Sequence, residues 1–141
     1  MSEYDNDILL WSERQGALLR RIGAGEQMND QVDWENVAEE IESVGREQLH
    51  AVESLLGQAL RHMLKAEAWP LHRDAPSWRA DAIDFRGQAA DRFVPSMRQR
   101  IDLARIYARA LRSLPEAVDG QPPLPLPATC PVTLDELLSD D

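Results

Sequence analysis

The stretch that decides the fold is residues 34–68, which read WENVAEEIESVGREQLHAVESLLGQALRHMLKAEA. Apolar side chains recur in it at steps of three and four, which places them on one face of a helix. That face consists of Val37, Ile41, Val44, Val52, Leu55, Ala59 and Met63, widened by Leu49, Leu56, Leu60 and Leu64. Asp33 is a suitable N-cap, and no proline interrupts the pattern before Pro70. The stretch predicts a single helix roughly 50 Å long, and a break into two helices at Gly45 stays open.

Shorter helical patterns lie on both sides of this stretch. One runs from about Asp5 to Ile22. Another begins near Ser77, a candidate cap, and ends at Pro95. A further helix is expected from Ser96, whose Ser-x-x-Gln pattern is a capping box. With no strand pattern in the sequence, we predict an all-α protein: an antiparallel helical bundle of four main helices around one long central helix.

The chain changes character after residue 114. Residues 121–127 read QPPLPLP, a pattern typical of extended polyproline-like chain, and their leucines are expected to lie against the bundle. Thr133-Leu134-Asp135-Glu136 is a second capping box and predicts a short helix through Leu138. We therefore expect one helical domain over residues 1–141, with a bundle (1–114), a Pro-rich extended segment (115–132) and a short terminal helix (133–138).

Composition limits the setting of the protein. A chain of 141 residues suits one domain, and no apolar run approaches the roughly 18 residues that cross a bilayer. The acidic residues 1–7 lack the pattern of a secretory signal, and the lone Cys130 fits a reducing compartment. We expect a cytoplasmic protein with no membrane partner.

Charge is distributed unevenly along the chain. The formal net charge of −10 argues against binding of nucleic acid through the acidic surface. Residues 61–112, however, hold eleven Lys and Arg against six Asp and Glu, whereas residues 1–60 hold four Arg against thirteen acids. Residues 113–141 hold six acids and neither Lys nor Arg. Either acidic and basic helices neutralise each other, or the basic part forms a patch that receives an anion or an acidic partner.

The turn between the long helix and the next one is the predicted ligand site. Cations, two tryptophans and a helix N-terminus converge there, which would suit a carboxylate or phosphate. The candidate residues are His62, Lys65, Trp69, Arg73, Ser77, Trp78 and Arg86. The alternative is structural, with Arg73 and Arg86 ion-paired to glutamates of the long helix to orient the turn.

A metal site is the third pattern to consider. Glu47-x-x-His50 has the spacing of a ligand helix in di-iron bundles, but that arrangement needs a second such pair, which the sequence lacks. The metal candidates are Glu39, Glu42, Glu47 and His50. A solvated or ion-paired face is the alternative that we favour, and we expect no metal and no cofactor.

Motifs along the whole chain resemble one protein family. They are Tyr4-Asp5-x-Asp7, Trp11, Gln15, Leu18-Leu19-Arg20, Asp33-x-x-Asn36-Val37-x-Glu39-Glu40-Ile41-Glu42-x-x-Gly45-Arg46-Glu47, His62-Met63-Leu64-Lys65, Trp69-Pro70-x-x-Arg73, Ser77-Trp78, Pro95-Ser96-Met97 and Cys130-Pro131-x-Thr133. The combination is similar to the bacterial helical family catalogued as domain of unknown function, family 29. Members usually carry Trp where this chain has Ala66, and Thr-Ile where it has Ala82-Ile83. The resemblance implies a helical fold in a bacterial cytoplasm, and it implies no activity.

The sequence supports binding better than catalysis. It contains no Gly-x-Ser-x-Gly elbow and no phosphate-binding glycine loop. The leading hypothesis is an interaction module without catalytic activity, whose partner is another protein. The alternatives are a module that binds a small anion or metabolite at the predicted turn, and a metal-dependent helical-bundle enzyme. A homo-oligomer stays open.

Overall fold

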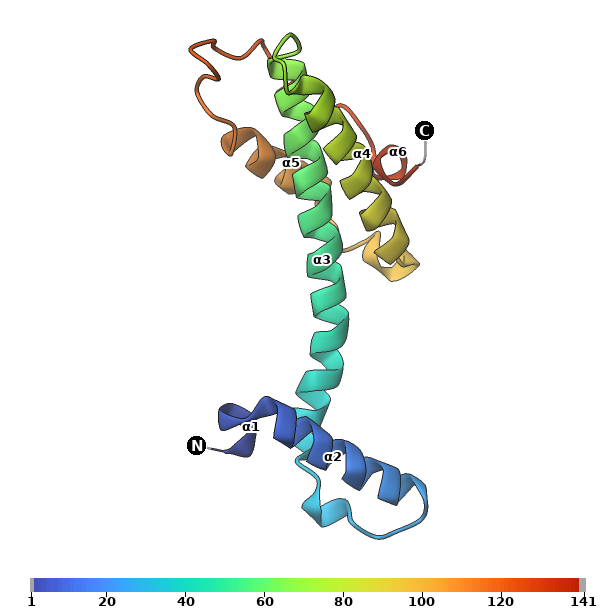
Figure 1. The fold of residues 1–141 in the computed structure, drawn as a ribbon. Helices are drawn as coiled ribbons and strands as arrows, with labels where there is room; N and C mark the ends of the chain where they lie inside the picture. Colours follow the sequence, from blue (N-terminus) through green and yellow to red (C-terminus); the bar gives the residue numbers. More distant parts are fainter. Residues whose placement is uncertain (1, 140–141) are drawn as a thin grey trace. The chain divides into compact units, whose positions relative to one another are not determined.

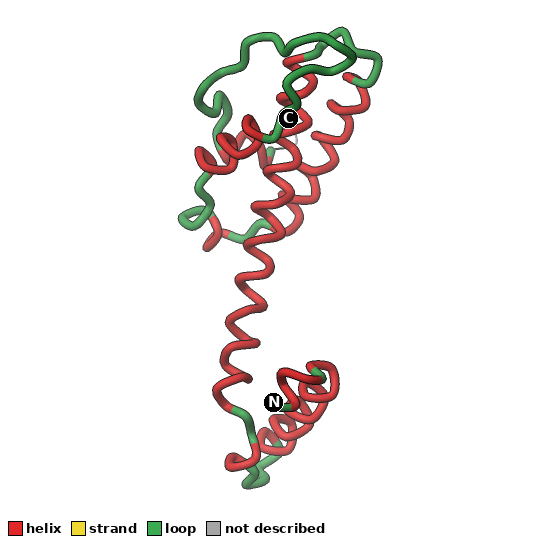
Figure 2. Tube along the Cα trace, turned by 90° about the vertical axis from the view of Figure 1, so that its left-hand side faces the viewer, coloured by secondary structure: helices red, strands yellow, loops and turns green. Residues whose placement is uncertain are grey.

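The computed structural model describes residues 2–139. Helices account for 68% of these residues, and no strand occurs among them (Figure 2), which confirms the all-α prediction. The helices are α1 (Glu3–Asn6), α2 (Ile8–Gly23), α3 (Trp34–Ala68), α4 (Ala75–Arg92), α5 (Leu103–Arg112) and α6 (Leu134–Leu138), with 3-10 turns η1 (Asn29–Gln31) and η2 (Pro95–Met97).

The chain divides into two compact units, unit 1 (Met1–Arg46) and unit 2 (Glu47–Asp141). The boundary falls inside α3, so each unit contains a part of this helix. The expectations of one domain and of a single antiparallel bundle stay predictions.

Helix α3 is continuous from Trp34 to Ala68, as its apolar periodicity predicts (Figure 1). It does not break at Gly45, where a Cβ atom would meet no neighbouring atom within 4 Å. A Cβ on Gly57 would lie 3.6 Å from Cγ2 of Ile106 in α5. Gly57 therefore marks a place where α5 packs against α3 within unit 2.

Unit 1 is built around a small apolar core. Trp11 from α2, Val32 and Val37 are buried and pack together. The carboxylate of Asp33 accepts hydrogen bonds from Trp11 Nε1 (3.0 Å) and from the side-chain amide of Asn36 (2.8 Å). One side chain thus anchors the indole of α2 at the residue where α3 begins.

The first predicted helix is interrupted, which corrects the expectation of one helix from Asp5 to Ile22. Helix α1 ends at Asn6, and the side chain of Asp7 accepts a hydrogen bond from Leu10 N at 3.0 Å. An aspartate in this conformation is a strong N-cap. Asp7 therefore starts α2 as a new helix instead of continuing α1.

The core of unit 2 forms where α4 and α5 pack on the second part of α3. In Figure 1, α4 returns alongside α3 and α5 lies against it. The buried cluster consists of Val52, Leu56, Leu60, Leu64, Ala89, Met97, Tyr107, Ala110 and Leu137. Four of these nine residues come from the predicted stripe of α3, so the sequence pattern identified the central part of this core.

Two predicted helix starts are wrong. Helix α4 begins at Ala75, two residues before the expected cap Ser77, and Pro76 lies in its first turn. Proline fits there because the first N–H groups of a helix have no intrahelical acceptor. Ser96 lies within η2, and α5 begins after Asp102, whose side chain accepts a hydrogen bond from a backbone N–H of the first turn. In both places a residue better suited than serine to start a helix competes with it.

The Pro-rich segment is fixed to unit 2 mainly through its carbonyl groups. Tyr107 donates its hydroxyl to the carbonyl of Pro127 (2.5 Å), and Leu124 N donates to the carbonyl of Ala68 (3.0 Å). Leu126 packs against the core, whereas Leu124 is 52% exposed. The expectation that the leucines lie against the bundle is confirmed for Leu126 only.

The terminal helix forms as predicted. The hydroxyl of Thr133 accepts a hydrogen bond from Glu136 N, and the Glu136 carboxylate accepts one from Thr133 N, which completes the capping box of α6. At the other end of α6, the Arg86 guanidinium donates to the carbonyls of Glu136, Leu137 and Ser139 at 2.9–3.1 Å. Arg86 is therefore engaged with α6 and not with a glutamate of α3, which corrects the ion pair expected for it.

Candidate functional site

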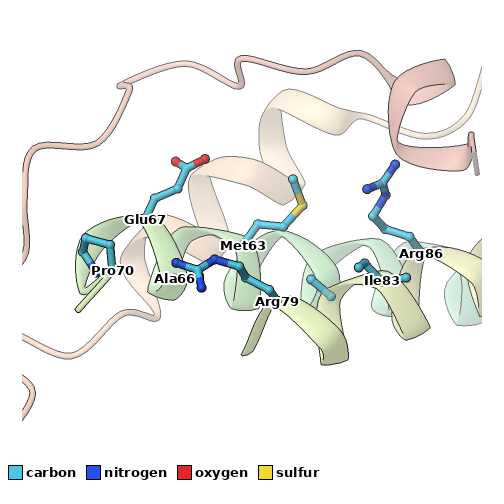
Figure 3. Close-up of a pocket in the computed structure, with 8 residues that line it drawn as sticks. Met63, Ala66, Glu67, Pro70, Arg79, Ile83 and Arg86 are labelled. Atoms are coloured by element: carbon cyan, nitrogen blue, oxygen red, sulfur yellow. The ribbon is translucent and has the colours of Figure 1, made fainter. Parts of the chain in front are cut away.

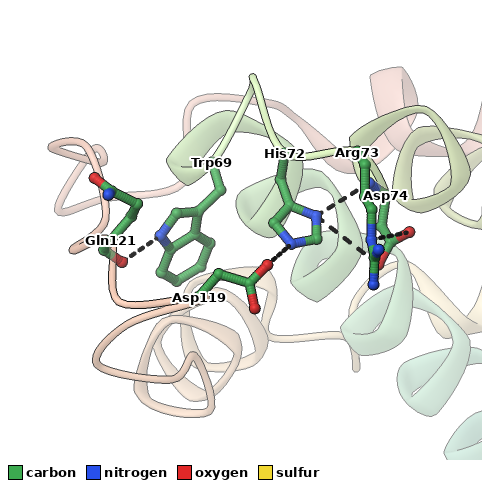
Figure 4. A network of polar contacts seen from close by, with 6 residues as sticks. All are labelled: Trp69, His72, Arg73, Asp74, Asp119 and Gln121. Carbon is green, nitrogen blue, oxygen red and sulfur yellow. Dashed lines mark hydrogen bonds and ion pairs between the residues drawn. The ribbon is translucent and has the colours of Figure 1, made fainter.

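The turn between α3 and α4, the predicted ligand site, contains a network of structural contacts (Figure 4). The buried Trp69 donates its indole N–H to the carbonyl of Gln121 at 2.8 Å. The imidazole ring of His72 stacks on the ring of Trp78, with 5.0 Å between the ring centres. Its Nε2 lies 2.7 Å from the carboxylate of Asp119. These contacts hold the turn at residues 118–121, in the segment that follows α5, against the end of α3.

The remaining cations of the predicted site are partly engaged. Lys65 Nζ lies 4.5 Å from the centre of the Trp78 ring, and His62 Nδ1 lies 2.8 Å from the carbonyl of Gln58. The Arg73 side chain is 87% exposed, and its one ion pair within residues 2–139 is with the neighbouring Asp74, at 4.0 Å. Ser77 is exposed on the first turn of α4.

The structure thus brings Lys65, Trp69 and Trp78 together with His72, and leaves Arg73 and Ser77 at the surface. Ion pairing of Arg73 with a glutamate of α3 does not occur in the part of the chain that is described. Ligand binding by the seven predicted residues stays a prediction.

A shallow hollow lies between α3 and α4 (Figure 3). It measures about 360 Å³ and is lined by Met63, Ala66, Glu67, Pro70, Arg79, Ala82, Ile83 and Arg86. Ala66 and Ala82 are buried, at 4% and 2% exposure. Small side chains at these two positions therefore contribute to the space between the helices.

The metal candidates do not form a ligand cluster. Glu39 is ion-paired with Arg46 (2.5 Å), and Glu42, Glu47 and His50 are exposed on α3. No group of three or more His, Cys, Asp or Glu side chains in residues 2–139 is arranged to hold a metal ion. Glu39 therefore fits the alternative prediction, an ion-paired face of the long helix.

A larger groove, which the sequence did not predict, lies between α3 and α5 in unit 2. Its volume is about 560 Å³, and it is lined by His50, Glu53, Ser54, Gly57, Gln58, Arg61, Arg100, Asp102, Arg105, Ile106, Arg109, Ala110 and Ser113. Four arginines contribute to this lining. None of the four has an ion pair or a side-chain hydrogen bond within residues 2–139. We call this feature the arginine groove.

The arginine groove escaped prediction because its cations come from separate elements. Arg61 is on α3, Arg100 precedes α5, and Arg105 and Arg109 are on α5. The excess of Lys and Arg in residues 61–112 was a signal for a basic patch. Placing the helix start at Ser96 instead of Leu103 hid which of these arginines face α3.

Unit 1 carries a different kind of surface, an exposed apolar row on α3. The row consists of Trp34, Ile41 and Val44, which are 50%, 67% and 61% exposed. Spacings of seven and three place them on one side of the helix. Ile41 and Val44 were expected on the packed apolar face of the long helix, so their exposure corrects that prediction.

Polar contacts beside this row shift two pKa values. A hydrogen bond to the Glu40 carboxylate raises the pKa of Tyr4 to about 12. Hydrogen bonds from the Asn36 side chain and the Trp11 indole lower the pKa of Asp33 from its ordinary value. Both shifts arise from contacts that tie α1 and α2 to the start of α3.

These features define the class of the protein, which is all-helical over the described residues. The chain belongs to the family described as domain of unknown function DUF29, whose family model matches residues 3–141. It is similar to the crystal structure of an α-helical protein of unknown function from Rhodospirillum rubrum, at 28% sequence identity and a TM-score of 0.72. That similarity covers 100% of this chain and 92% of the other. No curated protein matches the sequence.

One finding bears on the setting of the protein. None of the helices in residues 2–139 combines the length and the apolar character that a membrane span requires.

Proposed function

We propose that the protein is a cytoplasmic interaction module without catalytic activity, and that unit 1 binds a basic amphipathic helix of another protein. The observation that carries the proposal is the exposed apolar row of Trp34, Ile41 and Val44. Monomeric proteins seldom leave neighbouring large apolar side chains in water, and such patches commonly mark interaction sites.

The row continues a face of α3 that is already used for packing. Val37, on the same side of the helix, is 7% exposed and packs against Trp11 of α2. One and two turns further on, Ile41 and Val44 have lost this cover. Burying each of them against a partner would contribute about 1.5–3 kcal/mol, so a second helix could bind here as α2 does at Val37.

The negative charge of unit 1 indicates which kind of partner helix binds there. Residues 1–46 hold four arginines and eleven Asp and Glu, a balance of −7. Three of these arginines form ion pairs with acids of unit 1, and one of these pairs joins Arg46 and Glu39. Glu35 and Glu42, on the exposed part of α3, have neither an ion pair nor a side-chain hydrogen bond among the described residues. An apolar row beside free carboxylates fits a helix that carries Leu or Ile on one face and Lys or Arg beside it.

The test compares two designed helical peptides of equal length and helicity. The basic peptide carries Leu on one face and Lys beside it, and the acidic peptide carries Glu in place of each Lys. We expect the basic peptide to bind the full chain, measured by fluorescence anisotropy, with a salt-dependent affinity. The double variant Ile41→Ser/Val44→Ser should weaken binding by about tenfold or more, because two apolar contacts are lost. Leu71→Ser is the matched control, since Leu71 is 97% exposed in the α3–α4 turn of unit 2.

The result that contradicts the proposal is equal binding of both peptides, or equal loss in the double variant and in Leu71→Ser. A change from dimer to monomer in the double variant, seen by sedimentation, would show that a second copy covers the row. That outcome also contradicts a basic partner helix.

A further inference from the structure

Independently of the proposed function, we infer that the arginine groove of unit 2 binds a compact anion that carries at least two phosphate groups. The inference starts from the state of its four arginines. Arg61, Arg100, Arg105 and Arg109 line one groove, and no carboxylate in residues 2–139 lies within 4.0 Å of any of their guanidinium nitrogens. Elsewhere in the same unit, Arg98 forms an ion pair with Asp135 at 2.5 Å. Arginines of unit 2 can therefore have carboxylate partners, and those of the groove have none among the described residues.

The acids of the groove compensate only half of the charge of its arginines. Only Glu53 and Asp102 line it, against four arginines. The Asp102 carboxylate accepts a hydrogen bond from Arg105 N, 3.1 Å away, because it caps α5. It is therefore directed at the backbone and not at a guanidinium. Four neighbouring cations repel each other, and a multivalent anion placed among them removes this repulsion.

The spacing of the arginines indicates more than one phosphate. Arg105 and Arg109 are four residues apart on α5, which corresponds to about 6 Å along the helix. Arg61 approaches from α3, on the other side of the groove. Guanidinium groups on the two sides of the groove can each hold a separate phosphate of one ligand through two parallel hydrogen bonds. The volume of about 560 Å³ accommodates a ligand of this size.

The floor and rim of the groove suit a compact ligand. Gly57, Ile106 and Ala110 bring α3 and α5 close together, so the arginines stand around an apolar base. Ser54, Gln58 and Ser113 add polar groups to the lining. A nucleic acid strand would extend past the groove over a chain whose net charge is −10, and there it would meet carboxylates. A small phosphorylated molecule avoids that repulsion.

The experiment titrates the full chain with inorganic tripolyphosphate and, separately, with orthophosphate, by isothermal calorimetry at low and at physiological salt. We expect one tripolyphosphate per chain, bound more tightly than orthophosphate. Arg105→Gln and Arg109→Gln should each weaken it by about tenfold, since each removes charge-assisted hydrogen bonds. Arg112→Gln is the matched control, because Arg112 is an exposed arginine of α5 outside the groove.

Folding does not confound this comparison. None of the three substituted side chains has a partner among the described residues, so the unfolding temperature of each variant should match that of the native chain. Equal affinity for the two anions, or binding abolished at physiological salt, would mean an adventitious ion only and would overturn the inference. Equal weakening in Arg112→Gln would overturn it too, as would tighter binding of a single-stranded oligonucleotide or an acidic peptide in competition with tripolyphosphate.

Discussion

Leu56 of α3 is fully buried in unit 2, whereas Ile41 of the same helix is 67% exposed in unit 1. Both residues belong to one apolar pattern that runs along the helix. In unit 2, residues of α4, η2, α5 and α6 cover the pattern and form with it a cluster of nine buried side chains. In unit 1, α2 and the segment before α3 each provide one residue, Trp11 and Val32, which pack with Val37 of α3 in a cluster of three. Periodicity therefore shows which face of a helix is able to pack, and the number of elements around it decides how much of that face is buried.

The largest expected effect is a direct test of this difference. Leu60→Ala removes a side chain that is 2% exposed in the core of unit 2 and should lower the free energy of unfolding by about 2–5 kcal/mol. Ile41→Ala removes an exposed side chain and should change it by less than about 0.5 kcal/mol. Urea denaturation followed by circular dichroism measures both. Comparable losses in the two variants would mean that Ile41 is buried in the native protein.

A smaller effect is expected at the start of α3. Asp33→Ala removes the acceptor of the Trp11 and Asn36 hydrogen bonds and should lower the free energy of unfolding by less than Leu60→Ala does, because these bonds lie near the surface. The pKa of Asp33 is lowered in the folded chain, so its contribution is present above the ordinary aspartate value and is lost as the pH falls through the folded value. Amide exchange in the first turn of α3, measured from neutral to acidic pH, should show this acid dependence in the native chain and not in Asp33→Ala.

The smallest effect concerns Tyr4 at alkaline pH. Its pKa of about 12 means that the hydrogen bond to Glu40 contributes fully below the ordinary tyrosine value of 10.0 and is lost as the pH rises through 12. Absorbance titration at 295 nm should show one fewer high-pH transition in Tyr4→Phe. Burial also raises the pKa of Tyr107, so a Tyr107→Phe background isolates the Tyr4 signal. A Tyr4 transition near pH 10 would show that the contact with Glu40 does not persist in solution.

Most of the helical structure was predictable because it depends on local pattern. The stripe of α3 and the Thr133 capping box specify their helices through neighbouring residues alone. The starts of α4 and α5 were missed for an equally local reason. Serine was taken as the cap at Ser77 and Ser96, whereas Pro76 and Asp102 determine where these helices begin.

The candidate site was harder to predict because it depends on contacts between distant residues. Arg61 and Arg109 are 48 positions apart and meet at one groove only because α5 packs on α3 at Gly57. In the same way, Arg86 donates to three carbonyls at the end of α6, about 50 positions further along the chain, and not to the glutamate of α3 that was expected as its partner. A charged residue in a sequence shows what it is able to bind, and the fold decides which partner it reaches.

The attachment of the Pro-rich segment has a consequence for how the protein behaves at high concentration. The carbonyls of Gln121 and Pro127 accept hydrogen bonds from Trp69 and Tyr107, and the N–H of Leu124 donates to the carbonyl of Ala68. The prolines at positions 122, 123, 125 and 127 have no N–H to offer. An extended surface segment would normally be a template for edge-to-edge pairing between chains. This one lacks the donors that a pairing strand needs, so the protein carries extended chain on its surface without an aggregation-prone edge.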